Sequence, residues 1–320
     1  MSVAPEREAA TGYRYPFPPF PEGWFAVAVG ADVPAGAMRP LRVLGRELIV
    51  YRTGDGVATV LDAHCPHLGA HLGYGGSVHQ DTVRCPFHGW VFAADGSCVD
   101  APGSDRPPPQ ARLHAYPVIE WAGLVLVHHH PDDAVPTWFP ELPDLEPAFV
   151  WCESRRWTVR VHVQDVAENG FDMAHIEHVH RSPTPELVRA EPEGQTFVVE
   201  TRPRPDCPTR AYLDGIDRVL WGLGLSMNVF RGAIEGRVVL TRTPIDTEHS
   251  EIGLHFWPAR LDTATETQDV GRLLADRVSA ELEQDIDIWE HKRYLERPML
   301  VAGDGPIGTF RRWARQFHPA

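Results

Sequence analysis

The chain has 320 residues, of which 43% are apolar, and a formal net charge of −14. This length exceeds that of a usual single domain, so we expect two packed domains. The acidic balance argues against a nucleic-acid partner, because phosphate binding needs clustered Lys and Arg. No apolar run reaches the roughly 20 residues of a membrane helix, and the N-terminus resembles no targeting signal, which predicts a soluble, cytoplasmic protein.

The first part of the chain has the pattern of a β domain. Residues 24–130 contain short β-branched runs such as RVLGRELIVYR and VIEWAGLVLVHHH, separated by turn sequences such as GDG and ADGS. Five prolines then fall within residues 131–147, which suits neither a helix nor a central strand. We therefore predict a first domain over residues 1–150, with an N-terminal arm and a linker, and a second over residues 151–320.

The second part of the chain mixes strand and helix patterns, which makes the predicted fold class α+β. Strands are predicted at residues 157–163, 196–202, 236–245 and 252–258. Helices are predicted at residues 165–178 and 270–296, the latter from its helical periodicity.

Two loops of the first domain combine Cys and His. The chain reads Cys65-x-His67, then seventeen residues, then Cys85-x-x-His88. One thiolate and one imidazole from each loop are the ligand set of a 2Fe-2S cluster in which two His replace two Cys on one iron. A zinc site is the alternative, but zinc fingers usually place a Cys pair and a His pair, whereas each loop here mixes the two types.

These loops resemble those of Rieske 2Fe-2S proteins. Respiratory Rieske proteins carry an extra Cys in each loop, and this chain has Ala70 and Phe87 at those places. In this respect, and in Trp90, the chain is similar to Rieske oxygenases and their ferredoxins. The resemblance implies an all-β Rieske domain followed by a helix-grip catalytic domain, in which a long helix lies against an antiparallel sheet.

The second domain carries a sequence that would bind mononuclear iron. In ENGFDMAHIEHVH, Asn169, Asp172, His175 and His180 match the Rieske oxygenase motif Asn-x-x-Asp-x-x-His-x4-His. Two His and one carboxylate form a facial triad that leaves positions on Fe(II) open for O2. On an unbroken helix His178 would lie nearer to His175 than His180 does, at about 60° against 140°. Local geometry alone therefore favours His178, although Pro183 disfavours helix just before it and the chain can unwind there. Because the resemblance to the oxygenase motif implies His180, we choose it as the ligand and keep His178 as the alternative.

The third iron ligand is sought in the C-terminal helix. An apolar stripe recurs there at helical spacing: Leu274, Val278, Leu282, Ile286 and Trp289. Asp285 falls within this stripe, whereas Asp287 points away from it. A buried carboxylate needs a compensating cation or hydrogen bonds. A salt bridge would serve, but the related oxygenases also take their carboxylate ligand from a late helix, so we assign Asp285 to the metal.

Three other signals are predicted to have no catalytic role. Residues 303–308 fit the dinucleotide pattern G-x-G-x-x-G, but only twelve residues follow, too few for a βαβ unit, so a turn is expected. His128, His129 and His130 close an apolar strand, where consecutive side chains point to opposite faces. Cys98, Cys152 and Cys207 are expected to be small buried residues.

The resemblance covers most of the chain and is greatest to the branch with cholesterol 7-desaturases and 3-ketosteroid 9α-hydroxylase oxygenases. It implies hydroxylation or desaturation of a steroid-like substrate with electrons from a ferredoxin or an NAD(P)H-dependent reductase. It also implies a homotrimer, in which Asp172 carries electrons between subunits. The apolar run at residues 219–230 is a candidate pocket wall. Small aromatic acids are the alternative substrates, with Arg231 or Arg237 as an anchor, and an electron carrier with an inactive second domain is the alternative class.

Overall fold

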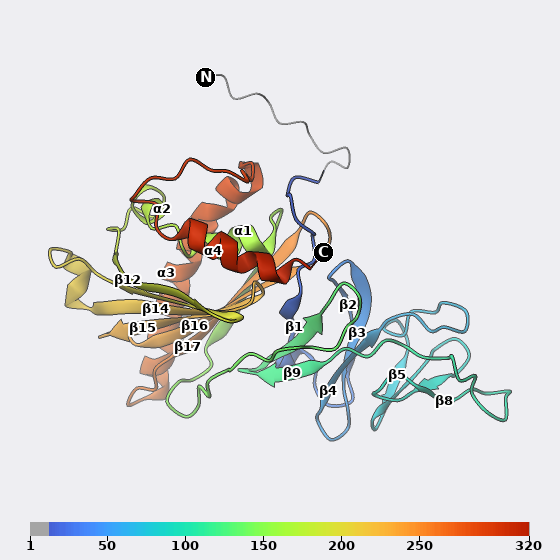
Figure 1. Ribbon diagram of the computed structural model, residues 1–320. Coiled ribbons are helices and arrows are strands. Elements are labelled where there is room, and N and C mark those ends of the chain that lie inside the picture. Colours follow the sequence, from blue (N-terminus) through green and yellow to red (C-terminus); the bar gives the residue numbers. More distant parts are fainter. Residues whose placement is uncertain (1–12, 320) are drawn as a thin grey trace. The chain divides into compact units, whose positions relative to one another are not determined.

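The computed structural model describes residues 13–319 (Figure 1). Internal contacts divide them into an N-terminal unit, residues 22–145, and a C-terminal unit, residues 146–319 together with 13–21. The division after Leu145 lies close to the expected boundary at residue 150. The proline-rich arm, however, packs on the C-terminal unit: Tyr15 is buried, and its hydroxyl accepts a hydrogen bond of 3.1 Å from the backbone N–H of His162.

The N-terminal unit is built from strands, as predicted, and its one described helical turn is η1 (Gly30–Asp32). It contains three antiparallel sheets. Their strands, in spatial order, are β1 (Gly23–Val29), β10 (Leu124–His129) and β9 (Val118–Trp121); β2 (Met38–Val43), β3 (Arg46–Arg52) and β4 (Ala58–Asp62); and β5 (Ser77–His79), β6 (Thr82–Arg84), β7 (Val91–Phe92) and β8 (Cys98–Asp100).

The C-terminal unit contains one antiparallel sheet of seven strands in the order β11-β17-β16-β15-β14-β13-β12. The strands are β11 (Glu153–Val159), β12 (Glu186–Glu193), β13 (Thr196–Arg202), β14 (Leu213–Trp221), β15 (Leu225–Gly232), β16 (Gly236–Pro244) and β17 (Ser250–Pro258). The helices are α1 (Val163–Asn169), α2 (Ala174–His178), α3 (Ala264–His291) and α4 (Ile307–Ala314), with short turns η2 (Pro208–Ala211) and η3 (Arg315–Phe317).

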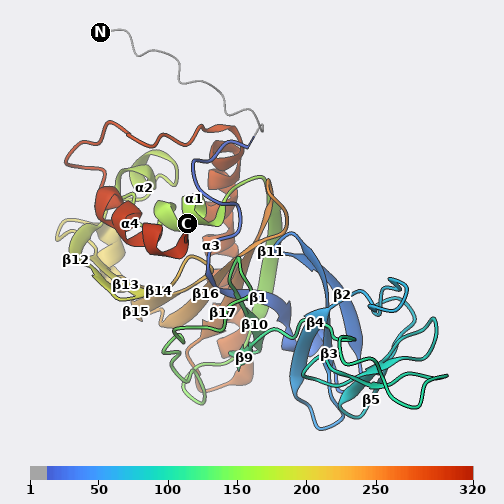
Figure 2. The same ribbon diagram turned by 45° about the vertical axis from the view of Figure 1, so that its right-hand side comes forward.

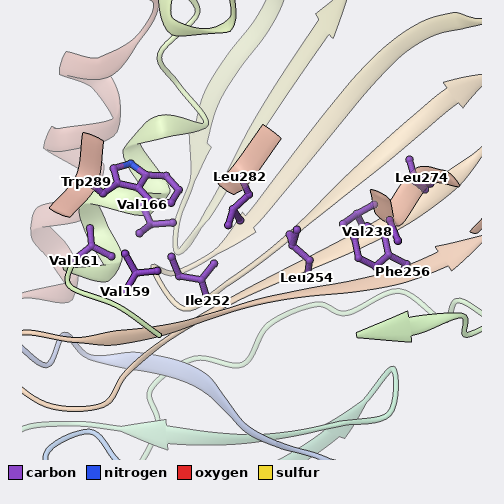
Figure 3. Packing of buried hydrophobic residues seen from close by; sticks show 11 residues of the cluster. Val159, Val161, Val166, Val238, Ile252, Leu254, Phe256, Leu274, Leu282 and Trp289 are labelled. Atoms are coloured by element: carbon purple, nitrogen blue, oxygen red, sulfur yellow. The ribbon is translucent and has the colours of Figure 1, made fainter. Parts of the chain in front are cut away.

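Helices α1, α3 and α4 lie on the same face of this sheet in both views (Figures 1 and 2). The core beneath α3 is apolar: in Figure 3, Leu274 of α3 lies beside Val238 of β16 and Phe256 of β17, whereas Trp289 lies beside Val161 and Val166. Because strand side chains alternate between the two faces, every second residue of the central strands faces the helices. The predicted long helix on an antiparallel sheet is confirmed.

Three of the predicted elements differ from the structure by more than two residues at an end. The first strand of the C-terminal unit ends at Val159 rather than at residue 163, because His162 caps α1 by accepting a 3.0 Å hydrogen bond from Gln164 N–H. The helix predicted at residues 165–178 is two short helices, α1 and α2. Helix α3 begins at Ala264 rather than at 270, because Thr263 and Glu266 form a capping box. It ends at His291 rather than at 296, where Lys292 is already extended.

Candidate metal centres

The two Cys/His loops of the N-terminal unit share one backbone design. In the first loop, after β4, the N–H of Gly69 bonds the carbonyl of Cys65 at 2.9 Å. In the second, between β6 and β7, the N–H of Gly89 bonds the carbonyl of Cys85 at 3.1 Å. Both glycines have φ of 75°, a left-handed conformation that Gly adopts without strain. The loops therefore turn in the same way and present their ligands from two sides.

The four side chains form a buried thiol pair and an exposed imidazole pair. Cys65 and Cys85 are buried in the apolar core of the unit, whereas His67 and His88 are exposed. The two imidazole rings lie 4.6 Å apart, and His67 stacks on Trp90 with the same centroid distance. Burial, and to a smaller extent the neighbouring Cys85, raise the pKa of the Cys65 thiol to about 11. This donor set, with thiols inside and imidazoles at the surface, fits a 2Fe-2S cluster with Cys on one iron and His on the other.

His175 of the C-terminal unit is held in a single tautomer. It lies on α2, and its Nδ1 is 2.6 Å from the backbone carbonyl oxygen of Asp172. Because a carbonyl only accepts hydrogen bonds, Nδ1 must carry the proton, and Nε2 presents its lone pair away from the helix. Such an outer contact orients a metal-ligating His.

His180 lies beyond the end of α2 rather than on an unbroken helix. Helix α2 ends at His178, and Arg181 adopts a positive φ of 56°. The N–H of Ser182 bonds the carbonyl of Ile176 at 3.2 Å, which closes the turn. The angles of an ideal helix therefore do not apply. The imidazole of His180 is buried in the site, whereas His178 is exposed, so the structure brings together His175 and His180 and not His178.

Asp285 reaches the same place from α3, as predicted from the apolar stripe. It is 5% exposed in a helix face that also buries Leu282 and Trp289, whereas Asp287 is exposed. Burial raises the pKa of the Asp285 carboxyl, and the imidazoles of His180 and His175 oppose that shift. A cation at this place would stabilise the carboxylate.

The three predicted ligands converge. One donor atom from each of His175, His180 and Asp285 lies within 4.8 Å of the other two. The Nε2 of His180 is 3.6 Å from Oδ2 of Asp285. Asn169, at the end of α1, donates from Nδ2 to Asp285 Oδ2 at 2.9 Å, and the same nitrogen is 3.2 Å from His175 Nε2. Two imidazoles and one carboxylate are the donor set of a non-haem Fe(II) triad, so the residues present fit this metal.

Asp172 contacts α2 through both its carboxylate and its backbone carbonyl. Its Oδ1 accepts the backbone N–H groups of Ala174 at 3.0 Å and His175 at 3.1 Å, as a helix cap does. The same oxygen is 3.8 Å from His175 Nδ1, which bonds the Asp172 carbonyl instead. Burial raises the pKa of the Asp172 carboxyl, but the contacts from His175 and Ala174 outweigh it, so the pKa lies below its ordinary value.

Two features that support the triad were not predicted. Gln284, next to Asp285, lies with Oε1 3.1 Å from His180 Nδ1, so it fixes the tautomer of His180. Its position beside a proposed ligand was the only sequence signal for this role. The second feature is α4, which follows the expected turn: Arg311 forms a two-pronged ion pair with buried Glu168 of α1, at 2.6 and 2.7 Å.

The glycine-rich segment before α4 braces the metal site instead of binding a dinucleotide. The carbonyl of Asp304 accepts the N–H of Met173 at 3.2 Å, within the break between α1 and α2. A Cβ on Gly305 would lie 2.3 Å from the carbonyl oxygen of Phe171. The segment therefore packs directly against the backbone that positions Asn169 and His175.

A cavity of about 590 Å³ opens beside the triad. Its size lies within the range of pockets that enclose a drug-sized ligand, about 300–1,000 Å³. Most of the wall is apolar, with Leu220 and Phe230 contributed by the run at residues 219–230, so part of that run does line the cavity. The wall also includes His175, His180 and Asp285.

The arginines in the cavity wall are not the expected ones. Arg231 pairs with Asp217 at 2.5 Å and Arg237 stacks over Phe149, and neither lines the cavity. Arg218 and Arg242 line it, as do Arg202 and Arg277, which pair with Asp217 and Glu281. Arg218 and Arg242 were not predicted, because a single Arg in a strand pattern is expected at the surface until the sheet register is known.

The remaining signals have structural roles. His128 and His129 are buried in β10, and Cys207 is buried, while Cys98 and Cys152 are partly buried. Among the described helices, none has both the length and the apolar character needed to cross a bilayer.

Comparison with known families assigns both units. Residues 23–119 match the Rieske [2Fe-2S] domain, and residues 127–318 match the 3-ketosteroid 9α-hydroxylase C-terminal domain. A cholesterol 7-desaturase of Bombyx mori is 31% identical over 94% of this chain and 70% of its own length. The oxygenase component of a 3-ketosteroid-9-alpha-monooxygenase from Rhodococcus rhodochrous is 28% identical over 93% of this chain and 84% of its own.

Solved structures with the same fold are more distant in sequence. Dicamba monooxygenase bound to dicamba superposes with a TM-score of 0.73 at 20% identity, over 92% of this chain and 96% of that one. Pseudomonas putida CBB5 NdmA with caffeine gives a TM-score of 0.74 at 18% identity, over 91% and 89% of the two chains. At these identities the likeness establishes the two-part architecture.

Proposed function

Since the chain belongs to the 3-ketosteroid 9α-hydroxylase family of Rieske oxygenases, we propose that it hydroxylates or desaturates a C–H bond of a steroid- or sterol-like substrate. The co-substrate is O2, and electrons come from a separate ferredoxin or NAD(P)H-dependent reductase. The observation that supports this function best is the convergence of His175, His180 and Asp285 on the wall of a largely apolar cavity.

The protein residues have separate tasks around the two centres. When bound, the 2Fe-2S cluster supplies single electrons and the mononuclear Fe(II) supplies activation of O2. Cys65, His67, Cys85 and His88 would hold the cluster. His175, His180 and Asp285 would hold the iron, with both imidazoles fixed in the tautomer that offers Nε2. The apolar wall excludes water and positions the substrate beside the triad.

Asp172 is proposed to connect the two centres in a homotrimer. In this assembly it would link His175 to His67 or His88 of the partner subunit. Two observations support the proposal. The Asp172 carbonyl oxygen accepts a hydrogen bond from His175 Nδ1. The Asp172 side chain is 33% exposed, so it can contact a further group. The alternative is that Asp172 only caps α2. We also propose a cytoplasmic location, where the thiols that hold the cluster remain reduced.

A substrate panel tests the proposed function. The holoenzyme, supplied with a surrogate reductase, would be incubated with sterols, 3-ketosteroids, polycyclic natural products and small aromatic acids, and products analysed by mass spectrometry. We expect oxygenated or desaturated products from the steroid-like compounds. Turnover restricted to small aromatic acids would reject the steroid assignment. An iron content of about two atoms per chain, with no turnover, would indicate an electron carrier instead.

A further inference from the structure

Two arginines, one partly buried and one buried, face the cavity from neighbouring parts of the sheet. Arg218 lies on β14 between Ile216 and Leu220, and all three line the cavity, as expected for every second residue of a strand. Arg242 lies on β16, two residues after Leu240, and is 3% exposed. Buried arginines normally face a carboxylate or a phosphate.

The hydrogen bonds of Arg218 and Arg242 leave some of their guanidinium N–H donors unused. Arg218 donates from Nε to Asn228 Oδ1 at 2.7 Å, and from Nη1 to the carbonyl of Gly170. Arg242 donates from Nε to the carbonyl of Leu223 at 2.9 Å and from Nη1 to Ser226 Oγ at 3.0 Å. Its Nη2 is buried and finds no hydrogen-bond partner within residues 13–319. All four acceptors are neutral, so none offsets the charge of either guanidinium.

The charge balance of Arg218 and Arg242 differs sharply from that of Arg202, which also lines the cavity, and of Arg231, which does not. Arg202 and Arg231 both pair with Asp217, at 2.6 and 2.5 Å. For Arg218, burial lowers the pKa to about 10. For Arg242, burial and then the positive charge of Arg218 lower the pKa to about 9. Within the part of the chain that the structure describes, neither has an ion pair with a carboxylate, so two like charges lie together on the wall.

We propose that Arg218 and Arg242 bind a carboxylate carried by an otherwise apolar substrate. This inference rests on the proposed function and specifies its substrate as an acid. A ketone or hydroxyl would supply an acceptor for the unused N–H donors, but only an anion would also offset the two charges. The remaining, largely apolar wall would enclose the rest of the substrate.

The position of this anchor connects it to the metal site. Arg218 bonds the carbonyl of Gly170, and Gly170 directly follows Asn169, whose amide contacts Asp285. An acid group held at Arg218 would therefore lie beside the segment that carries the triad. The anchor would fix the substrate in one orientation and so determine which C–H bond faces the iron.

Ligand binding without turnover tests the inference. Titration calorimetry under anaerobic, unreduced conditions would compare a steroid carboxylic acid with its methyl ester, and a phenylalkanoic acid with its methyl ester. Wild-type holoenzyme should bind at least one acid about tenfold or more tightly than its ester. Arg218→Met and Arg242→Met should lose this preference, and Arg242→Lys should keep part of it. Arg231→Met, which changes an exposed arginine outside the cavity, should behave as wild type.

The outcomes separate the two proposals. Equal or tighter binding of both esters by the wild-type protein would overturn the anchor, and this result needs no variant to fold. An acid preference that survives in both Met variants, each with wild-type iron content and circular dichroism, would also overturn it. Arginine-dependent binding of the phenylalkanoic acid without binding of either steroid would support the anchor and reject the steroid assignment.

Discussion

At the scale of single residues, both iron-site histidines are oriented by an acceptor behind the ring. His175 uses the carbonyl of Asp172, and His180 uses the side chain of Gln284. The first acceptor is backbone and cannot be removed by mutation, but the second is a replaceable side chain. Such outer contacts typically change metal affinity about 10–100-fold.

Replacing Gln284 tests the outer contact to His180. Gln284→Leu removes the acceptor, so we expect it to release mononuclear iron to a chelator at about 10–100-fold lower chelator concentration than wild type. Gln284→Glu keeps an acceptor of similar size and should retain the metal. Iron would be measured by chelator titration with absorbance of the cluster as an internal reference. If Gln284→Leu released its iron at the same chelator concentration as the wild type, His180 would not need the contact from Gln284 to bind the metal.

Replacing Asp172 separates its two candidate roles. Asp172→Asn keeps an oxygen that can cap α2, because Asn is a good N-cap, but removes the charge. We expect both metal centres to remain while single-turnover electron transfer to the mononuclear iron slows by roughly 100-fold or more. Stopped-flow absorbance of the reduced cluster measures this rate. Near-normal transfer, or loss of the mononuclear iron, would assign Asp172 to capping or to metal support.

At the scale of elements, the metal site depends on the break between helices α1 and α2. One continuous helix over residues 163–178 would not bring Asn169, His175 and His180 together as α1, a turn and α2 do. The turn is held from outside by Asp304 and Gly305, which lie more than 130 residues later. Pairings of this kind cannot be read from local sequence, which explains why one helix was predicted.

A pair of glycine substitutions tests this brace. Gly305 has a φ of 88°, and an added Cβ would lie 2.3 Å from a backbone oxygen. We therefore expect Gly305→Ala to destabilise the protein by about 1–3 kcal/mol. The same substitution should weaken the binding of mononuclear iron. Gly303→Ala is the matched control, because its Cβ would meet no atom within 4 Å. Urea denaturation and iron content measure both effects. Equal behaviour of the two variants would contradict the brace.

The sequence predicted most of the site because its chemistry follows regular patterns. Asp285 stands in a helical apolar stripe, where a carboxylate is conspicuous, and the Cys/His loops have a fixed spacing. Arg218 and Arg242 escaped prediction because only the register of β14 to β16 shows which face they occupy. Helix α4 was not predicted because its 8 residues are too few for its buried side chains to establish a helical period.

At the scale of the whole molecule, buried neutral histidines make stability depend on pH. Burial lowers the pKa of His162 and His255 to about 3, and that of His129 and His318 to about 4. In the unfolded chain a His titrates near 6.5. Between these values the unfolded chain binds protons that the folded chain does not, so the free energy of unfolding falls as the pH is lowered.

His162 allows this dependence to be measured for one group. Its Nδ1 accepts from Gln164 N–H and its Nε2 faces the carbonyl of Pro18, and after burial the proximity of His318 is the next cause of its lowered pKa. His162→Asn keeps a capping acceptor but does not titrate. Between pH 6.5 and 5 the free energy of unfolding should fall less steeply with pH in His162→Asn than in the wild type. The two slopes should differ by about 1.4 kcal/mol per pH unit. Urea denaturation at several pH values measures both slopes, and identical slopes would contradict the assignment.

Iron content tests the central claim, a cluster in one unit and a mononuclear Fe(II) held by His175, His180 and Asp285 in the other. Anaerobically purified wild-type protein should contain about three iron atoms per chain and give a Rieske-type EPR signal when reduced. Asp285→Ala should contain about two with the EPR signal intact, and Asp287→Ala, which changes an exposed neighbour, should contain about three. Loss of the mononuclear iron in Asp287→Ala but not in Asp285→Ala, or a colourless zinc protein, would contradict the account.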